Sequence, residues 1–220
     1  MTEVVFRVPP LFDYVATVAW AISGAVVGIR KQFDVTGVFV VALLSSMGGG
    51  LMRDAIFLKR TPVVLTDPVY LPLVAGTTLI MVLLTERLIQ AGPAETVRKL
   101  VDVIDSLGTP AFAVVGMQLA RDQGIPVIGV IFVGAVNGLA GGLLRDVVVR
   151  DVPTLLRPGQ FISFMLVVAC GVFQILTLRY DVRPTPAAWV TVAAFFVMRV
   201  LALRFNWQTR SVWDPDTGRR

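Results

Sequence analysis

The chain has 220 residues, of which 55% are hydrophobic and only 16% are charged, and its mean hydropathy is +0.76. Soluble domains carry about a quarter charged residues, so this surplus of apolar sequence indicates a protein that sits in lipid. The sequence contains no histidine, which excludes histidine-based acid–base catalysis and most zinc sites. Its net charge of +5 comes from basic residues in short loops between apolar runs, which favours membrane orientation over nucleic-acid binding.

A membrane-spanning helix needs about 20 largely apolar residues. The sequence contains seven stretches of roughly this length, at residues 11–29, 36–57, 68–90, 104–121, 126–149, 160–178 and 186–205. A polar tail, 206–220, follows the last stretch. We therefore predict an all-α integral membrane protein of seven transmembrane helices that forms a single membrane domain over residues 1–220.

The sequence repeats itself after a shift of 92 residues. The clearest agreement joins Gly49, Gly50, Leu51, Arg53 and Asp54 to Gly141, Gly142, Leu143, Arg145 and Asp146. Each copy holds three predicted helices, about 11–90 in the first repeat and about 103–180 in the second. An odd number of helices makes the second copy enter the membrane from the opposite face, so we predict inverted repeats with a site near the membrane midplane. The seventh helix, about 186–205, stands outside the duplication.

The distribution of basic residues predicts the orientation. With three arginines inside apolar runs set aside, one side of the membrane holds six basic residues and the other holds eleven. The side with more Lys and Arg faces the cytoplasm. We expect a multi-pass protein of the cell inner membrane with its N-terminus outside and its C-terminus in the cytoplasm.

Glycines interrupt the second helix of each repeat, at residues 45–54 and 137–146. Each glycine costs a helix about 1 kcal/mol relative to alanine, so we expect a broken or kinked helix in both repeats. Irregular backbone at membrane depth must be buried in protein or line water, and its carbonyls can bind a cation. The candidate pore residues are Ser45, Ser46, Gly48, Gly49, Gly50, Asn137, Gly138, Gly141 and Gly142. The alternative is that these glycines only allow close helix packing.

Two Arg-Asp pairs follow the glycines: Arg53 with Asp54, and Arg145 with Asp146. A charge inside the bilayer is costly, so it faces protein or water. Each Arg could simply pair with a carboxylate. It could also form a gate, sense voltage, bind an anionic lipid head group or bind the carboxylate of a small amino acid. An unneutralised Arg in an open pore would repel cations.

Other polar residues and prolines have structural explanations. Asp13 and Asp105 occupy matching positions in the two repeats, and we interpret both as helix N-caps. Pro62 and Pro153 follow the glycine-rich helices and are expected to end them. We identify no cluster of metal ligands and no paired catalytic residues, so we expect neither an enzyme nor a metal site.

The doubled Gly-Gly-x-x-Arg-Asp motif, the two three-helix units and the extra helix resemble the prokaryotic trimeric intracellular cation (TRIC) channels, over roughly residues 11–205. The same unit is also known as a bacterial glycine-transporter domain. The resemblance implies a homotrimer with a pore in each protomer, permeable to potassium and other monovalent cations. It also implies gating by voltage or by ions, and lipid bound at basic residues. We expect no cofactor.

Three functions remain open from the sequence. The first is a potassium-permeable channel with its pore between the broken helices. The second is a carrier of glycine or another small zwitterion, with the arginines as carboxylate ligands. The third is a scaffold or lipid-binding protein in which the glycines only pack.

Overall fold

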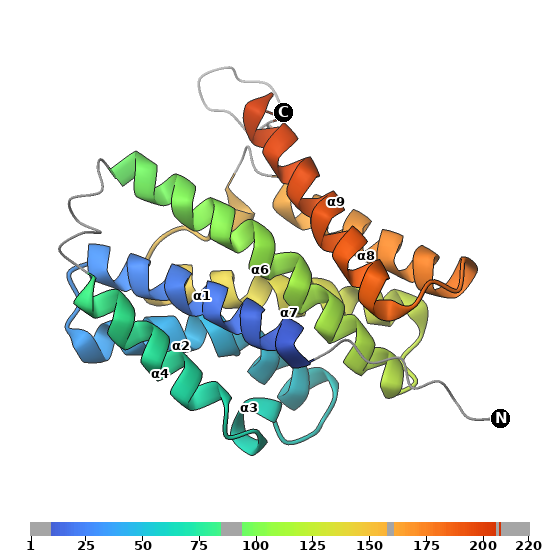
Figure 1. The fold of residues 1–220 in the computed structure, drawn as a ribbon, viewed down its shortest axis with the longest axis horizontal. Coiled ribbons are helices and arrows are strands. Elements are labelled where there is room, and N and C mark those ends of the chain that lie inside the picture. The colour runs from blue at the N-terminus through green and yellow to red at the C-terminus, as the bar shows by residue number, and fades with distance from the viewer. Residues whose placement is uncertain (1–9, 85–93, 158–160, 206, 208–220) are drawn as a thin grey trace, which may run out of the picture.

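The computed structural model describes residues 10–84, 94–157, 161–205 and 207, and every regular element in this part of the chain is a helix (Figure 1). The first repeat contains α1 (Pro10–Arg30), α2 (Val35–Met52), the π-helical turn η1 (Arg53–Phe57), α3 (Val63–Thr66) and α4 (Tyr70–Leu83). The second repeat contains α6 (Ala94–Asp122), α7 (Val127–Val148), the 3₁₀ turn η2 (Thr154–Leu156) and α8 (Ile162–Arg179), and α9 (Pro184–Arg204) follows it.

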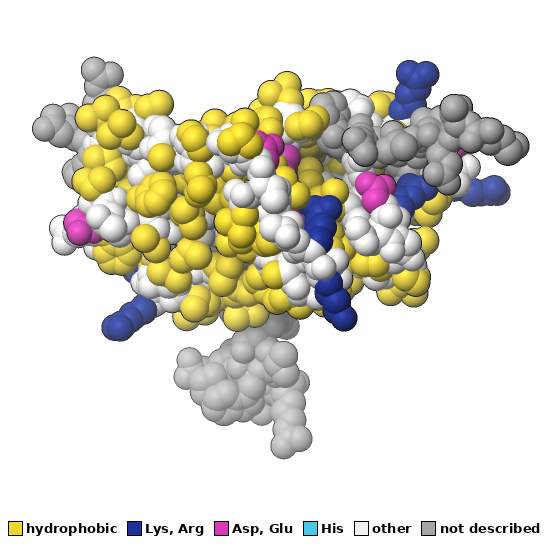
Figure 2. Space-filling view, turned by 90° about the horizontal axis from the view of Figure 1, so that it is seen from below, with side chains coloured by type: hydrophobic (Ala, Val, Ile, Leu, Met, Phe, Trp, Pro, Cys, Tyr) yellow, Lys and Arg dark blue, Asp and Glu magenta, His cyan; other side chains and the backbone are white. Residues whose placement is uncertain are grey.

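Six of the predicted transmembrane helices are confirmed as helices long and apolar enough to cross a membrane. The third predicted helix, 68–90, is represented by the shorter apolar helix α4, and residues 85–90 of that prediction lie outside the described residues. Apolar side chains cover most of the molecular face in Figure 2. Such a surface suits lipid rather than water.

The two repeats pack as inverted copies around a central pair of helices. α2 contacts α7, while α1 packs on α2, α4 and α6, and α6 packs on α7, α8 and α9. α4 and the α8–α9 pair lie on opposite sides of these central helices (Figure 1). Lys31, just after α1, binds Asp151, just after α7, at 2.7 Å. Helices α1 and α7 therefore end at the same side of the molecule.

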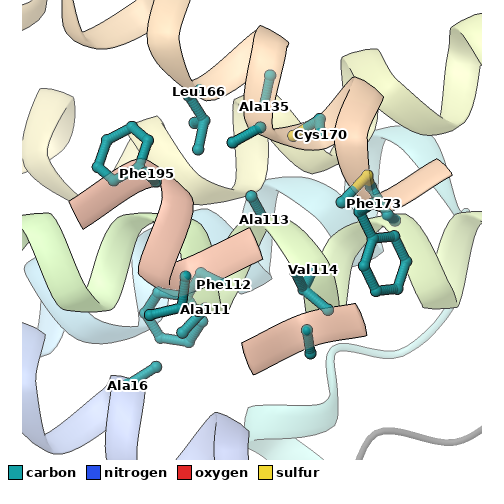
Figure 3. Packing of buried hydrophobic residues seen from close by; sticks show 14 of the residues in the cluster. Ala16, Ala111, Phe112, Ala113, Val114, Ala135, Leu166, Cys170, Phe173 and Phe195 are labelled. Carbon is teal, nitrogen blue, oxygen red and sulfur yellow. The ribbon is translucent and has the colours of Figure 1, made fainter. Parts of the chain in front are cut away.

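The apolar core follows this division into two halves. One buried cluster joins α1 to α6, α7, α8 and α9, and Figure 3 shows Phe112 and Phe195 within it. A second cluster joins α1 to α2 and α4, with Val38 and Val74 almost fully buried. Close packing of this kind holds α2 and α7 in a fixed position relative to α1 and α6.

Of the two forms expected at the glycines, the unwound turn is wrong. α2 runs through Gly48, Gly49 and Gly50 as a regular α-helix, and α7 does the same through Gly141 and Gly142. The only departure near either motif is η1, where α2 widens into a π-helical turn immediately after the glycines. The glycines stay within regular helices. Their missing side chains allow α2 and α7 to approach each other closely.

Candidate functional site

The centre of the molecule is an antiparallel crossing of α2 and α7. A Cβ atom added to Gly49 would overlap the main-chain carbonyl oxygen of Asn137, and one added to Gly141 would overlap that of Ser45. These four residues are two equivalent pairs under the 92-residue shift. The pseudo-twofold axis relating the repeats therefore passes through this contact. Only glycine lets the two backbones come this close.

A second pair of glycines supports the crossing from outside. A Cβ on Gly24 of α1 would lie 2.6 Å from Ser45 Oγ, and one on Gly116 of α6 would lie 2.8 Å from Asn137 Cβ. Gly24 and Gly116 are again equivalent in the two repeats. The packing interpretation thus accounts for these glycines, and it places Ser45 and Asn137 at the centre of four helices.

The other predicted pore residues surround this centre. Gly48 faces the end of the Leu144 side chain, whereas Gly138 faces the carbonyl oxygen of Thr109. The Ser46 hydroxyl donates to the carbonyl oxygen of Ala42 at 2.8 Å, within its own helix.

Two buried oxygen atoms at the crossing have no hydrogen-bond partner within the described residues: Ser45 Oγ and Asn137 Oδ1. Ser45 is fully buried and Asn137 is 1% exposed. The amide nitrogen of Asn137 donates to the Phe112 carbonyl at 2.5 Å, which fixes the direction of the side chain. Buried polar atoms are nearly always paired, so a hydroxyl and an amide oxygen without partners at equivalent positions require an explanation.

The first Arg-Asp pair lies beyond the crossing on the α1 N-terminal side. The Arg53 guanidinium donates to both carboxylate oxygens of Asp54, at 2.8 and 2.9 Å. Asp54 also accepts from Arg60 at 3.0 Å and from the main-chain N–H of Val63 at 2.9 Å. Both Arg53 and Asp54 are almost fully buried. Within the described part of the chain, Asp54 is the only hydrogen-bonding partner of the Arg53 guanidinium.

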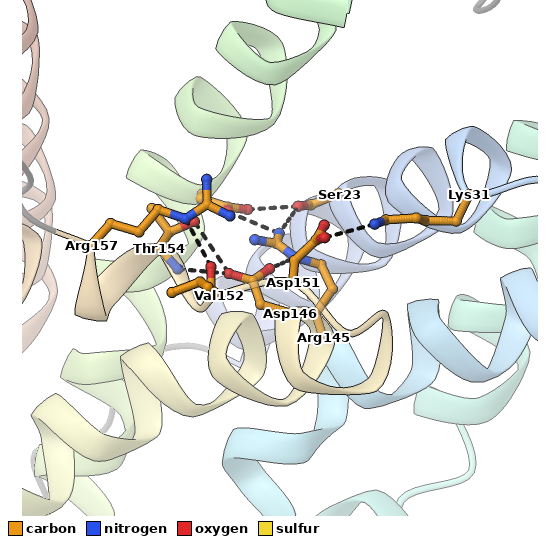
Figure 4. Close-up of polar contacts among 9 residues, drawn as sticks. Ser23, Lys31, Arg145, Asp146, Asp151, Val152, Thr154 and Arg157 are labelled. Atoms are coloured by element: carbon orange, nitrogen blue, oxygen red, sulfur yellow. Dashed lines mark hydrogen bonds and ion pairs between the residues drawn. The ribbon is translucent and has the colours of Figure 1, made fainter.

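The second pair, on the opposite side of the crossing, has more partners (Figure 4). Arg145 donates to Asp146 at 2.9 Å, to Asp105 at 2.9 Å and to the Ser23 hydroxyl. Its guanidinium carbon also lies 5.6 Å from the ring centre of Trp20, in cation–π range. Both arginines are thus paired with carboxylates, but Arg145 is held from several helices.

A small cavity lies beside each arginine. The Arg53 cavity has a volume of about 20 Å³, and among the residues that line it are Asp13, Thr17, Gly50, Arg53, Asp54, Tyr70 and Phe112. The Arg145 cavity has a volume of about 40 Å³, and its lining includes Trp20, Asp102, Asp105, Thr109, Gly142, Arg145, Asp146 and Arg199. Most of these residues match under the 92-residue shift. The α2–α7 crossing therefore has equivalent polar cavities on its two sides.

The interpretation of Asp13 and Asp105 as helix caps is wrong. α6 begins at Ala94, so Asp105 lies well inside a helix, where it binds Arg145 and accepts from Ser23 at 2.7 Å. Asp13 lies within α1 and accepts a hydrogen bond from the Tyr70 hydroxyl. The sequence contained one indication that Asp13 and Asp105 belong with the arginines, because the shift that aligns the two Arg-Asp pairs also aligns these two carboxylates.

The prolines have a different role from the one expected. η1 ends at Phe57 and α7 at Val148, before either proline is reached. Pro62 and Pro153 instead precede the short helices α3 and η2. Their fixed φ suits the residue that leads into a helix.

Fold and site together define a multi-pass helical membrane protein of inverted repeats, with charged cavities on both sides of a glycine-mediated helix crossing. A sequence profile of the family described as "Glycine transporter" matches the chain twice, at residues 10–86 and 102–178. The chain belongs to this family. It is 30% identical over 202 residues to a UPF0126 membrane protein of Deinococcus radiodurans, a match that covers 91% of this chain and 87% of the relative. It is 24% identical over 208 residues to the inner membrane protein YadS of Escherichia coli, covering 94% and 97%.

Solved structures share the fold. A TRIC cation channel superposes with a TM-score of 0.80 at 27% identity, covering 94% of this chain and 98% of the channel. The TRIC orthologue from Rhodobacter sphaeroides superposes with a TM-score of 0.80 at 23% identity, covering 89% and 97%. Membrane helices and inverted repeats, as predicted from the sequence, are confirmed by this agreement.

Proposed function

We propose that this protein is a cation channel, permeable to potassium and other monovalent cations, with one pore inside each protomer. The pore runs from the Arg53 cavity, through the α2–α7 crossing, to the Arg145 cavity. Support comes from the shared fold and 27% identity with a solved TRIC cation channel. The observation that carries the proposal is the pair of equivalent cavities on the two sides of the crossing.

The charges around the cavities suit a cation. Two carboxylates and one guanidinium line the Arg53 cavity, and three carboxylates and two guanidiniums line the Arg145 cavity. The residues lining the Arg145 cavity therefore have one carboxylate in excess, whereas at the Arg53 cavity Arg60, which binds Asp54 at 3.0 Å, balances the second carboxylate. Arg53 and Arg145 are both bound to aspartates. The positive charges that would repel a cation are thus neutralised, as a cation pore requires.

The conformation described above is a closed one. A cavity of about 10–15 Å³ is needed for one water molecule, so the two cavities hold only a few waters. Between them, Gly49 and Gly141 are in direct backbone contact with the opposite helix. Opening requires α2 and α7 to separate, which would expose Ser45 Oγ and Asn137 Oδ1 to the pore. An ion or water there would then give these orphan oxygens a partner.

The pore model extends to all the candidate residues from the sequence. Polar contacts come from Ser45, Ser46 and Asn137, and close helix approach comes from the glycines at 48–50, 138, 141 and 142. Arg53 with Asp54, and Arg145 with Asp146, shape the two entrances. We further propose a homotrimer in the bacterial inner membrane with its N-terminus outside, its C-terminus in the cytoplasm, and lipid bound at its surface.

A carrier of glycine or another small zwitterion is the second candidate, favoured by the family description and by the buried arginines, which could bind a carboxylate. Proteoliposomes separate the two functions. The channel predicts rapid potassium flux that does not saturate and that excess glycine leaves unchanged. Saturable uptake of labelled glycine, competed by unlabelled glycine and without potassium flux, would establish the carrier and overturn the channel.

A further inference from the structure

Helix α9 brings a charge to the Arg145 cavity that the duplication does not supply. The second of the two family matches ends at residue 178, before α9 begins at Pro184. α9 packs on α6 and α8. From it, Arg199 reaches the cavity lining and is only 3% exposed. A buried arginine inside a membrane helix is costly, so its position requires a reason.

Two carboxylates of α6 account for the buried position of Arg199. Arg199 interacts electrostatically with Asp102 and Asp105, and all three residues line the Arg145 cavity. Asp105 already binds Arg145 and Ser23. Asp102 is an addition of the second repeat, because its equivalent after the 92-residue shift is the uncharged Pro10. The Arg145 cavity therefore differs from the Arg53 cavity by one extra carboxylate and one extra guanidinium.

We infer that Asp102 and Arg199 act together to set the net charge of the Arg145 cavity, and thereby how strongly it selects cations over anions. The inference rests on the proposed channel function. With both residues present, their charges cancel, and one carboxylate remains in excess among the residues that line the Arg145 cavity. Removing Arg199 leaves two carboxylates in excess, and removing Asp102 leaves none.

These changes act on a small, partly enclosed space. One unit charge about 4–6 Å from an ion changes its energy by roughly 1 kcal/mol even in a water-like dielectric, which is about a fivefold change in local concentration. A cavity with protein walls concentrates the field further. We expect the ratio of potassium to chloride permeability to change by about two- to fivefold, upward without Arg199 and downward without Asp102.

The test is the reversal potential of the purified protein in a planar bilayer with asymmetric potassium chloride. The variants are Arg199→Gln, Asp102→Asn and the double variant. Arg204→Gln is the matched control, because it removes the same charge from an exposed position at the end of α9. We expect Arg199→Gln to move the reversal potential toward the potassium equilibrium potential and Asp102→Asn to move it away. The double variant should restore the wild-type reversal potential.

A purely structural pair would not give opposite shifts that cancel. Arg199→Lys keeps the charge and should keep the wild-type selectivity, which provides a readout if Arg199→Gln does not fold. The inference is overturned if wild-type protein conducts and the single variants share its reversal potential, or if both shift it in the same direction. Wild-type protein without any current would instead remove the channel function, and this inference with it.

Discussion

Gly49 of α2 lies against the main-chain carbonyl oxygen of Asn137 in α7, and its equivalent Gly141 lies against that of Ser45. This reciprocal contact makes a simple test possible. Gly49→Ala and Gly141→Ala each put a Cβ into a backbone oxygen, which only separation of the helices can relieve. Overpacking of this kind costs about 1–3 kcal/mol, so the unfolding temperature in detergent should fall for both variants.

The control for this change is Gly76→Ala in α4, where an added Cβ meets no atom of the described residues within 4 Å. Alanine is the better helix former by about 1 kcal/mol, so Gly76→Ala should keep or raise the unfolding temperature. Equal unfolding temperatures for Gly49→Ala, Gly141→Ala and wild-type protein would show that the helices do not touch at the glycines.

The two arginines should respond differently to loss of the adjacent aspartate. Asp54→Asn leaves the Arg53 guanidinium buried without its carboxylate, and breaking a buried pair costs about 3–5 kcal/mol. Asp146→Asn should cost less, because Arg145 keeps Asp105 and Ser23. Denaturant titration in mixed micelles measures both losses. A larger loss for Asp146→Asn would contradict the partner assignment.

Substitution of Ser45 tests whether this residue lines the pore or only packs between helices. Its hydroxyl has no hydrogen-bond partner among the residues that the structure describes, so Ser45→Ala should leave the unfolding temperature nearly unchanged. If Ser45 Oγ contacts the permeating ion, its loss removes about 0.5–1.5 kcal/mol of interaction, a two- to tenfold fall in conductance. Thr191→Val is the control, since this buried hydroxyl of α9 bonds within its own helix. Unchanged single-channel conductance in Ser45→Ala would exclude Ser45 from the pore.

The Lys31–Asp151 ion pair makes the inversion of the repeats testable in cells. Lys31→Cys and Asp151→Cys should share one accessibility to a membrane-impermeant thiol reagent, and Asp181→Cys, after α8, should show the opposite one. The native Cys170 is buried and should stay unlabelled. With the cytoplasm on the α1 C-terminal side, only Asp181→Cys reacts in intact cells. Different labelling at positions 31 and 151 would contradict the inversion, whereas the reverse of the whole pattern would contradict only the orientation.

Much of this architecture could be predicted from the sequence because duplication repeats its signals. The 92-residue shift identified Ser45, Asn137 and the paired glycines, which the structure brings to one crossing. Whether the glycines unwind their helices could not be predicted. A glycine can weaken its own helix or allow another backbone to pack against it, and the sequence does not show which backbone lies opposite. For the same reason the partners of Asp105 were missed: Ser23 and Arg145 are 82 and 40 residues away in the chain. Arg199 was missed because α9 has no repeat to compare it with.

The central claim is that this chain forms a cation-selective pore. Its most direct test is single-channel recording of the purified wild-type protein in a planar bilayer, with a potassium chloride gradient across it. The pore predicts discrete current steps that reverse near the potassium equilibrium potential. A protein that is folded and inserted but carries no current, or steps that reverse near the chloride potential, would contradict the account.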